Sequence, residues 1–507
     1  MAIEIFLSLH GGPLKIRLHE KGLIMKKRVV VLVVMALVIP YYLRAIEGRC
    51  CKDERYRSFL FSRPLNQNVP LYQSMWHDYI YEKQGSCKTS FQCIGAYQES
   101  LNTRALNKYF LFDRKTEVSV IGDAAVGVQD RDVRAEWLGL PSNFYGALEL
   151  VPKQRQVGIF LNAHQDLNKF IAVDFFDGYW IDVNVPLVAV QNSIEIKQRI
   201  GATTTSASVS DFVQAFNRAD LRYAKISSVS RSRLRCPEIN IRFGRAYLSE
   251  DHFQVVYYSG ISAPLGNKQD AAYVFDPVVG NNGHWGFLVG AGFQVVTSRC
   301  SAPYATCLFL HVENIFFMHN TQHRTLDVRD KPWSRYMLLN HRDRGPEQNV
   351  PASSILTRRV KVHPYGMVDL SAGGRIFYQD WHIEAGYNLW AHARERIELK
   401  KSFPAVWGFA GIKDIANPTV ATTASLSTIA KQAANDADFV PIQEGDLYVR
   451  SGAALGTLVH KIHVSLGWGR KGAKFDGFFG VGAWFETPQH SGACKAVGCW
   501  LKLGGSF

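Results

Sequence analysis

The sequence predicts an all-β fold, a transmembrane antiparallel β-barrel, on three observations. From about residue 116 onward, apolar and polar residues alternate in stretches of about 8 to 14 residues, separated by turn-forming residues. The 507 residues include 30 Phe, 21 Tyr, 11 Trp and 41 Gly, a composition that favours pleated strands and tight turns. No stretch reaches the roughly 18 uninterrupted apolar residues that indicate a membrane-spanning helix.

The clearest predicted strand lies within the stretch DWHIEAGYNLWAHARER. It alternates over about 13 residues, well above the usual strand length of about 5 or 6. One face of this strand carries Trp381, Ile383, Ala385, Tyr387, Leu389, Ala391 and Ala393. The other face carries His382, Glu384, Gly386, Asn388, Trp390, His392 and Arg394.

Further strands follow the same alternation along the chain. An Asp177-Gly178 pair between two alternating runs predicts a hairpin. Other clear strands are expected within residues 155–164, 284–295, 461–469, 475–486 and 496–507. We expect about 14 strands in total, within a range of roughly 12 to 16. The good helix candidates are 210–219 and 424–437, each beginning at a Ser cap in a long connection, and a further short helix is indicated near 99–109.

Alternation alone does not separate a membrane barrel from a soluble sandwich. The strand lengths match the roughly 9 to 11 residues that cross a bilayer at a tilt. Aromatic residues stand near strand ends, where interfacial girdles lie: Tyr179, Trp381, Trp468, Phe475 and Phe485. The face opposite the apolar row is rich in Gly and ionisable residues, as in a wet or plugged interior. These features favour the barrel over a secreted soluble β-sandwich.

An export signal is predicted at residues 25–45. Met25 is followed by three basic residues at 26–28 and an eleven-residue apolar core at 29–39. This core is too short for a comfortable membrane-spanning helix. Leu43 and Arg44 are not the small residues usual at a cleavage site, so an uncleaved anchor is the alternative. Residues 1–24 are expected to be a spurious extension from an early start codon.

The charge and the cysteine content of the chain limit the kinds of ligand and cross-link that it is expected to have. The formal net charge is +14, but the basic residues are spread out, which disfavours a nucleic-acid tract. A basic balance also suits anionic lipid head groups or anionic solutes. Among nine cysteines, the pairs Cys87/Cys93 and Cys300/Cys307 are close enough to staple loops. No spacing matches a zinc site, and we predict neither metal nor cofactor.

The last stretch, AVGCWLKLGGSF, alternates and ends on Phe507. Val497, Cys499, Leu501 and Leu503 share a face with Phe507. This stretch resembles the C-terminal strand of Gram-negative outer-membrane β-barrel proteins, such as porins and fatty-acid transporters. The resemblance covers the architecture of residues 116–507, and no motif of a specific family is matched. It implies an outer-membrane location, contact with outer-membrane lipid, and recognition of Phe507 by the barrel assembly machinery.

Residues 46–115 are polar and irregular, and we expect a short periplasmic or plug segment there before a barrel at 116–507. One feature departs from the usual pattern. If Phe507 lies at the periplasmic end, counting strands back places the long segment 395–445 on the periplasmic side as well. Either a strand is miscounted, or this segment turns inward as a plug, or the class is wrong.

The predicted lumen-facing residues are mostly ionisable. We expect a solvated or mutually paired wall, since no nucleophile or metal partner accompanies them and no GxSxG, HExxH, Walker or dinucleotide motif is present. The candidates are Asp174, Asp182, Arg242, His284, His311, Glu313, Asp369, Arg375, His382, Glu384, Arg394, Lys461, His463, Asp476 and Glu486. The chain is therefore not expected to be an enzyme.

Three functions remain open from the sequence. The first is a porin or channel for passive or facilitated passage of small solutes. The second is a surface-exposed structural or interaction protein that a closed barrel only anchors. The third is a secreted soluble β-sandwich that binds carbohydrate.

Overall fold

A computed structural model covers the chain and divides into two units, residues 1–49 and 50–507. In the first unit, β1 (Glu4–Leu9) and β2 (Gly12–Arg17) form an antiparallel hairpin. The predicted signal at 25–45 lies outside the described residues. The structure describes residues 4–9, 12–17, 56–76, 89–101, 104–125, 127, 130–169, 177–201, 209–248, 253–296, 304–344, 348–364, 366–411, 423–433, 438–470, 472, 475–490 and 492–507.

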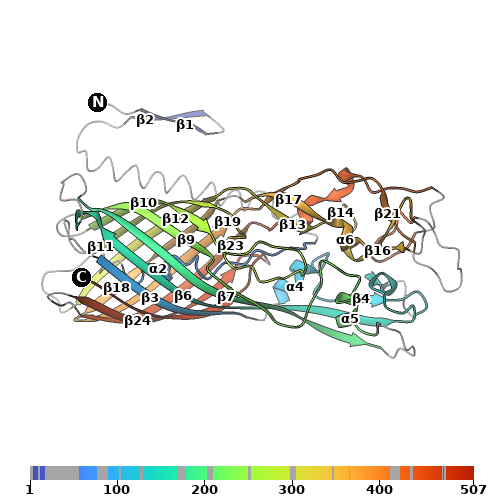
Figure 1. Cartoon of the computed structure of the whole chain (residues 1–507). Coiled ribbons are helices and arrows are strands. Elements are labelled where there is room, and N and C mark those ends of the chain that lie inside the picture. The colour runs from blue at the N-terminus through green and yellow to red at the C-terminus, as the bar shows by residue number, and fades with distance from the viewer. Residues whose placement is uncertain are drawn as a thin grey trace. The chain divides into compact units, whose positions relative to one another are not determined.

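Twelve antiparallel strands of the second unit close into a barrel (Figure 1). They are β3 (Thr89–Ser100), β6 (Tyr145–Asp166), β7 (Tyr179–Ile200), β9 (Glu238–Leu248), β10 (Phe253–Pro264), β11 (Gly286–Val296), β12 (Tyr304–Phe317), β18 (Met367–Tyr378), β19 (Trp381–His392), β23 (Thr457–Arg470), β24 (Asp476–Pro488) and β25 (Ala496–Ser506). The last strand, β25, pairs with the first, β3, and β6 pairs with β7 to complete the ring. The predicted all-β antiparallel barrel is confirmed, with a strand number inside the expected range.

The first barrel strand starts earlier than expected. β3 lies within residues 46–115, which the sequence assigns to a pre-barrel segment, and it pairs with β25 on one side and β6 on the other. Its side chains alternate between buried and outward positions, with Phe91 and Tyr97 outward and Ile94 buried. The boundary at residue 116 is therefore not the start of the barrel. The alternation of β3 is weak in the sequence because its inward row includes the apolar Ile94 and Ala96 and its outward row includes Gly95.

Long and short connections lie at opposite ends of the barrel. Residues 379–380 join β18 to β19 at the end where the chain terminates. Residues 318–366 and 393–456 make long connections at the other end. Counting back from Phe507, β25, β24 and β23 are three crossings, so the connection before β23 lies at the end opposite Phe507. The prediction that 395–445 lies on the same side as Phe507 was wrong, and the barrel follows the usual alternation of short turns and long loops.

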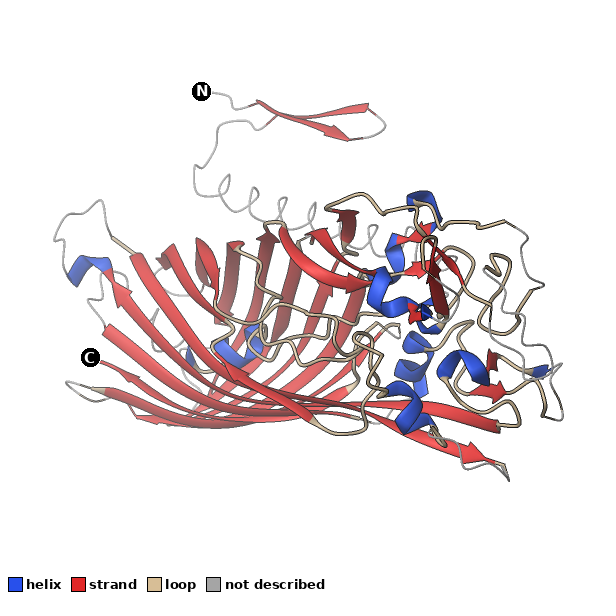
Figure 2. Ribbon diagram, turned by 45° about the vertical axis from the view of Figure 1, so that its right-hand side comes forward, coloured by secondary structure: helices blue, strands red, loops and turns tan. Residues whose placement is uncertain are grey.

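The long connections pack together into a cap, defined here as the described residues within 101–144, 201–237, 265–285, 318–366 and 393–456 with the outer ends of β6 and β7 (Figure 2). Its core is apolar and aromatic, with Trp137, Phe144, Phe216 and Trp333 fully buried. The cap strands are β4 (Val118–Ile121), β5 (Val133–Arg134), β8 (Arg231–Arg235), β13 (Asn320–Thr325), β14 (Asp327–Val328), β15 (Leu338–His341), β16 (Val350–Pro351), β17 (Thr357–His363), β20 (Arg396–Leu399), β21 (Trp407–Phe409) and β22 (Leu447–Tyr448).

In its described part the cap also holds three short α-helices, α4 (Arg104–Phe110), α5 (Phe212–Phe216) and α6 (Ala352–Leu356). α5 falls within the helix predicted at 210–219, but its N-cap is Asp211, whose side chain accepts a hydrogen bond from the Gln214 N–H, and not the preceding Ser. The helix predicted at 424–437 is wrong for the described residues 423–433, which form turns and bends. There, Ser427 and Thr428 bond to nearby backbone groups and compete with a helix.

The outer wall of the barrel is apolar. On β23, Ile462, Val464 and Leu466 are exposed, while the intervening Lys461 and His463 are buried. The exposed apolar row continues around the barrel, for example through Val157, Ile159, Leu161, Ile383, Val481, Leu501 and Leu503. A sheet that exposes its apolar face and buries its charged face inverts the pattern of a soluble protein and suits lipid around it. Among the described residues, no helix is both long and apolar enough to cross a membrane.

Candidate functional site: a plugged lumen

The interior of the barrel is filled by residues 56–76, here called the plug (Figure 1). The plug starts among cap residues, where Tyr56 and Leu60 belong to the cap core. It then runs through the lumen as an irregular segment with one short helix, α2 (Val69–Gln73), and reaches Trp76, whose ring packs against Phe478 near the turn end. Nearly all of its side chains are buried.

The first residues of the plug are built into the cap by backbone and side-chain hydrogen bonds. The Ser58 N–H donates to the Ser451 carbonyl at 2.9 Å, and the Tyr109 hydroxyl donates to the Phe59 carbonyl at 2.6 Å. Arg335 Nη2 donates to the Arg57 carbonyl at 3.1 Å, and its Nη1 pairs with Asp327 Oδ2 at 2.6 Å. Burial raises the pKa of Asp327, and the neighbouring Arg335 opposes this rise. This end of the plug is therefore as firmly packed as the cap itself.

Arg63 is the charged contact between the plug and the wall. Its Nη2 lies 2.9 Å from Asp369 Oδ2 and 2.9 Å from Asn388 Oδ1. Its Nη1 lies 3.6 Å from Glu486 Oε2, and the guanidinium carbon lies 5.6 Å from the centroid of the Trp390 ring. The four wall residues come from β18, β19 and β24, so one plug side chain ties three strands together.

The backbone of the plug is held by wall amides. Gln156 Oε1 accepts a hydrogen bond from the Leu65 N–H at 2.9 Å, and Gln156 Nε2 donates to the Arg63 carbonyl at 3.0 Å. The Asn66 side chain donates to Glu238, which Asn281 also reaches at 3.0 Å. The two Gln156 contacts satisfy backbone groups of an irregular segment that no strand pairs with. They are polar contacts, which water can replace if the plug moves.

The lower half of the plug is seated against the last strands. Lys502 Nζ donates to the carbonyls of Tyr72 at 3.2 Å and Ser74 at 2.6 Å. Ser74 Oγ lies 2.9 Å from Ser465 Oγ. Met75 packs over Gly467, where an added Cβ would lie 2.1 Å from the Met75 Cε, so a larger residue at this position would displace the end of the Met75 side chain.

A second cluster of charge pairs lines the wall beside the plug. Arg242 Nη1 lies 3.1 Å from Asp182 Oδ1, and its Nε lies 3.0 Å from Glu313 Oε2. The Tyr258 hydroxyl donates to the same Glu313 oxygen at 2.7 Å. His311 lies beside this cluster, with its Nε2 3.4 Å from the Tyr258 hydroxyl. Each charge therefore has an opposite partner within the wall itself.

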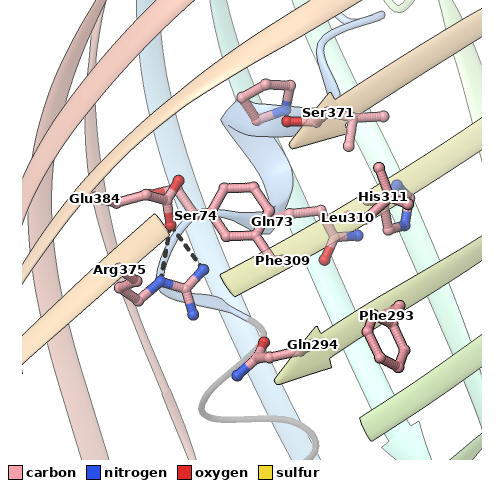
Figure 3. Close-up of a pocket in the computed structure, with 12 residues that line it drawn as sticks. Gln73, Ser74, Phe293, Gln294, Phe309, Leu310, His311, Ser371, Arg375 and Glu384 are labelled. Atoms are coloured by element: carbon pink, nitrogen blue, oxygen red, sulfur yellow. Dashed lines mark hydrogen bonds and ion pairs between the residues drawn. The ribbon is translucent and has the colours of Figure 1, made fainter. Parts of the chain in front are cut away.

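A third cluster joins Arg375 and Glu384 (Figure 3). Arg375 donates from both Nε and Nη2 to Glu384 Oε2, at 2.8 and 2.7 Å. His463 Nδ1 lies 3.8 Å from the other carboxylate oxygen of Glu384. Gln73 and Ser74 of the plug line the same small cavity.

The predicted lumen residues occupy three kinds of place. Those on barrel strands with buried or nearly buried side chains in the lumen are Asp182, Arg242, His311, Glu313, Asp369, Arg375, His382, Glu384, Lys461, His463 and Glu486. His284 and Arg394 lie in cap connections, and Asp476 is the first residue of β24 at the turn end. Asp174 lies outside the described residues. Ala391, expected to face lipid, is buried at the outer end of β19.

Sequence reasoning missed three charged residues of the site. Lys502 stands on the inward row of the final strand, so the alternation itself could have found it. Glu238 begins β9 and carries the same signal. Arg63 had no signal, because it stands in an irregular segment without periodicity. Its role depends on the path of the plug through the lumen, which no local pattern encodes.

Little space remains around the plug among the described residues. Three cavities that plug residues line have volumes of about 20, 30 and 30 Å³. Each has room for one or two water molecules and no more. Passage of a solute through the lumen therefore requires the plug to move.

Comparisons with known proteins add the following. No protein-family model matches the chain, and no curated protein matches it significantly. Similar solved structures include an outer membrane channel from Pseudomonas putida F1, at 10% identity and a TM-score of 0.37, over 83% of this chain and 96% of that one. A Pseudomonas aeruginosa FadL homologue is 7% identical with a TM-score of 0.28, over 83% and 90% of the two chains. The transport unit of the Escherichia coli autotransporter AIDA-I is 6% identical with a TM-score of 0.29, over 88% and 99%. At identities this low, the activities of these proteins cannot be assigned to this chain.

Proposed function

We propose that the chain is an outer-membrane β-barrel protein of the Gram-negative type that passes small polar solutes when its plug leaves the lumen. The observation that carries this proposal is the polar seat of the plug, in which Arg63 lies between Asp369 and Glu486 in a wall of buried charges. A lumen that never admitted water could be filled with apolar side chains at lower cost, because burying paired charges seldom adds stability. The proposal assigns no chemical reaction to the chain.

The apolar outer wall supports a membrane location for the barrel. Short turns lie at the end of Phe507, and the cap lies at the other end. In the outer membrane, short turns face the periplasm and long loops face outward. The cap would therefore stand on the cell surface, and the lipid of the outer membrane would surround β3 to β25. Export by the signal at 25–45 and insertion by the barrel assembly machinery belong to the same proposal.

A second candidate function is an anchor for a surface cap. It is favoured by one observation, the burial of plug residues 56–60, of which Tyr56 and Leu60 belong to the cap core. A plug that cannot leave without disrupting the cap would keep the barrel closed permanently. Phe61 and Ser62 are only half-buried, and they separate the cap-bound residues from the polar contacts of Arg63. Movement of residues 63–76 alone would open the lumen and leave the cap intact.

A reversible latch distinguishes the two functions. The double substitution Ser74→Cys/Ser465→Cys places two thiols where two hydroxyl oxygens lie 2.9 Å apart, which is close enough for a disulfide after small adjustments. Purified protein in planar bilayers would be recorded under oxidising and then reducing conditions. We expect wild-type protein to show openings, the oxidised latch to show none, and reduction to restore them.

The single substitution Ser74→Cys is the matched control, because it cannot form the latch and should not respond to reduction. Openings that persist in the fully oxidised latch would show that passage does not need the plug to move. A wild-type protein that conducts nothing at any voltage would leave the anchor function standing. Formation of the disulfide is checked independently by a mobility shift on non-reducing gels.

A further inference from the structure

We infer that the outer part of the lumen is a binding site for guanidinium-bearing cations, which Arg63 of the plug occupies in the closed state. The inference rests on the proposed function, because an external cation reaches this site only if the plug moves. It names the class of solute that the lumen would select. Asp369, Asn388, Trp390 and Glu486 form the site, here called the guanidinium site.

The guanidinium site matches the shape of its ligand. A guanidinium is planar and offers donors in a fixed fork, and it stacks on aromatic faces. Asp369 Oδ2 and Asn388 Oδ1 both accept from one Nη of Arg63 at 2.9 Å, Glu486 lies toward the other Nη, and Trp390 lies alongside. A carboxylate pair alone would accept any cation, whereas an amide and an indole add selection for a flat, delocalised one.

Contacts within the wall hold these side chains in place without the plug. Asn388 Nδ2 donates to Asp369 Oδ1 and to the Leu370 carbonyl. Gln98 Nε2 donates to Glu486 Oε1 at 3.0 Å, and Trp390 Nε1 lies 2.9 Å from the Met367 sulfur. The acceptors that Arg63 uses are therefore already oriented by barrel strands, and they would keep their positions when the plug leaves. A site that is preorganised in this way loses little entropy on binding.

One carboxylate oxygen of the site, Glu486 Oε2, is only loosely contacted by Arg63. Glu486 Oε2 is buried, and its contacts are ion pairs without well-aligned hydrogen bonds. Its neighbours are the Arg63 Nη1 at 3.6 Å and the Lys461 Nζ at 3.2 Å. Arg63 reaches over from the plug and fits this side of the site only loosely, and a free guanidinium without a backbone tether could approach the oxygen more closely.

The charge of the lumen supports the same class of solute. The wall strands carry six buried carboxylates against four cations: Asp182, Glu238, Glu313, Asp369, Glu384 and Glu486 against Arg242, Arg375, Lys461 and Lys502. Arg63 offsets part of this excess while the plug is in place. Its departure leaves a net negative lumen with Asp369 uncompensated, which attracts cations. The solute and Arg63 would compete for the same acceptors, so binding of one favours release of the other.

Chemical rescue in detergent tests the site without requiring passage. Arg63→Ala empties the site, and methylguanidinium is the probe. We expect methylguanidinium to raise the unfolding temperature of Arg63→Ala saturably, by about 2 °C or more. The double variant Arg63→Ala/Asp369→Asn should show no such rise, and methylurea, which has a similar shape without charge, should rescue neither. If Arg63→Ala does not refold alone, the refolding yield with and without methylguanidinium becomes the readout.

Equal stabilisation of Arg63→Ala by methylguanidinium and by tetramethylammonium would overturn the guanidinium selectivity, and no stabilisation or recovery by methylguanidinium would overturn the site. Since the measurement is made on unfolding, it is independent of conductance. A rescue without any openings in the latch experiment would leave the site standing and reject passage. Openings without rescue would support passage and reject the guanidinium site.

Discussion

Arg375 and Glu384 face each other across neighbouring strands β18 and β19, and two hydrogen bonds join them inside the filled lumen. Both side chains are 3% exposed. The sequence allows either a solvated or a mutually paired wall, and the structure shows the paired form, because the plug excludes water from these two residues. Removing the charge of Glu384 would leave the Arg375 guanidinium buried without its counter-charge, at a cost of about 3–5 kcal/mol.

We therefore expect Glu384→Gln to lower the unfolding temperature of the purified barrel clearly, in a gel-shift assay that compares heated and unheated samples. The double variant Arg375→Met/Glu384→Met is the control, since it removes both charges and should recover most of the loss. If Glu384→Gln unfolds at the wild-type temperature, the pair does not stabilise the closed lumen.

The outward row of β23 provides a test of the lipid-facing surface. Val464 is 59% exposed and stands between outward neighbours Ala385 and Ala483. Val464→Arg should destabilise the inserted barrel by about 2–4 kcal/mol if this position is near the bilayer midplane, and it should reduce the assembled fraction. Val464→Leu, which keeps the apolar surface, should assemble normally. Normal assembly of Val464→Arg would contradict a lipid environment for this face.

Phe507 provides a test of the C-terminal strand. Its N–H and carbonyl exchange hydrogen bonds with Thr89 of β3 at 2.9 Å, and its ring lies 6.5 Å from Phe91 on the outer face. Phe507→Asp would place a charge in the apolar row beside Phe91, so we expect much less assembled protein at unchanged synthesis. Quantification of folded and total protein in membrane fractions measures the ratio. Phe507→Trp keeps an aromatic terminus and should preserve assembly, and equal levels for both variants would refute a role as assembly signal.

His284 should make the outer end of the barrel sensitive to acid. Its Nδ1 donates to the Met318 carbonyl at 2.8 Å, and its Nε2 accepts from Gln322 at 2.9 Å, so both nitrogens of the neutral ring are hydrogen-bonded. Burial lowers the pKa of His284 to about 4 from its ordinary value of about 6.5. Between these values the unfolded chain binds a proton that the folded protein does not, so stability falls as pH decreases from about 6.5 to 4.

The loss at the lower end of this window amounts to at most about 3 kcal/mol. Denaturant unfolding of the protein in detergent at several pH values measures it. His284→Gln, which has no titrating group, should show a shallower dependence on pH in this window. Parallel curves for the two proteins would exclude His284 as the source of the acid sensitivity.

The regular part of the fold was predictable because each barrel strand repeats one local rule. Alternation places Lys461 and His463 inside and Ile462 and Val464 outside without knowledge of any partner. The state of the lumen was not predictable, because a polar inward row suits both an open pore and a filled one. Whether Glu384 meets water or Arg375 depends on the plug, which follows a path without periodicity.

The short elements of the cap were also beyond the sequence. β14 and β22 have two residues each, and their pairing joins positions more than a hundred residues apart. Local propensity carries no information on such pairs, since loop closure and packing decide them. The segment 395–445 was placed at the wrong end for a related reason: one error in the strand count reverses the side of every earlier connection.

The hydrogen bonds of Lys502 have a consequence for the biogenesis of the protein. Lys502 belongs to β25, the strand that completes the ring against β3, and its ammonium is satisfied by two carbonyls of residues that precede β3 in the chain. The same residue thus belongs to the strand that closes the ring and holds the plug inside it. A ring that closed while empty would bury this ammonium without the carbonyls of Tyr72 and Ser74. Such an empty ring would be less stable than the filled one. We therefore expect the plug to be in place when the ring closes, so that the newly inserted barrel is already impermeable.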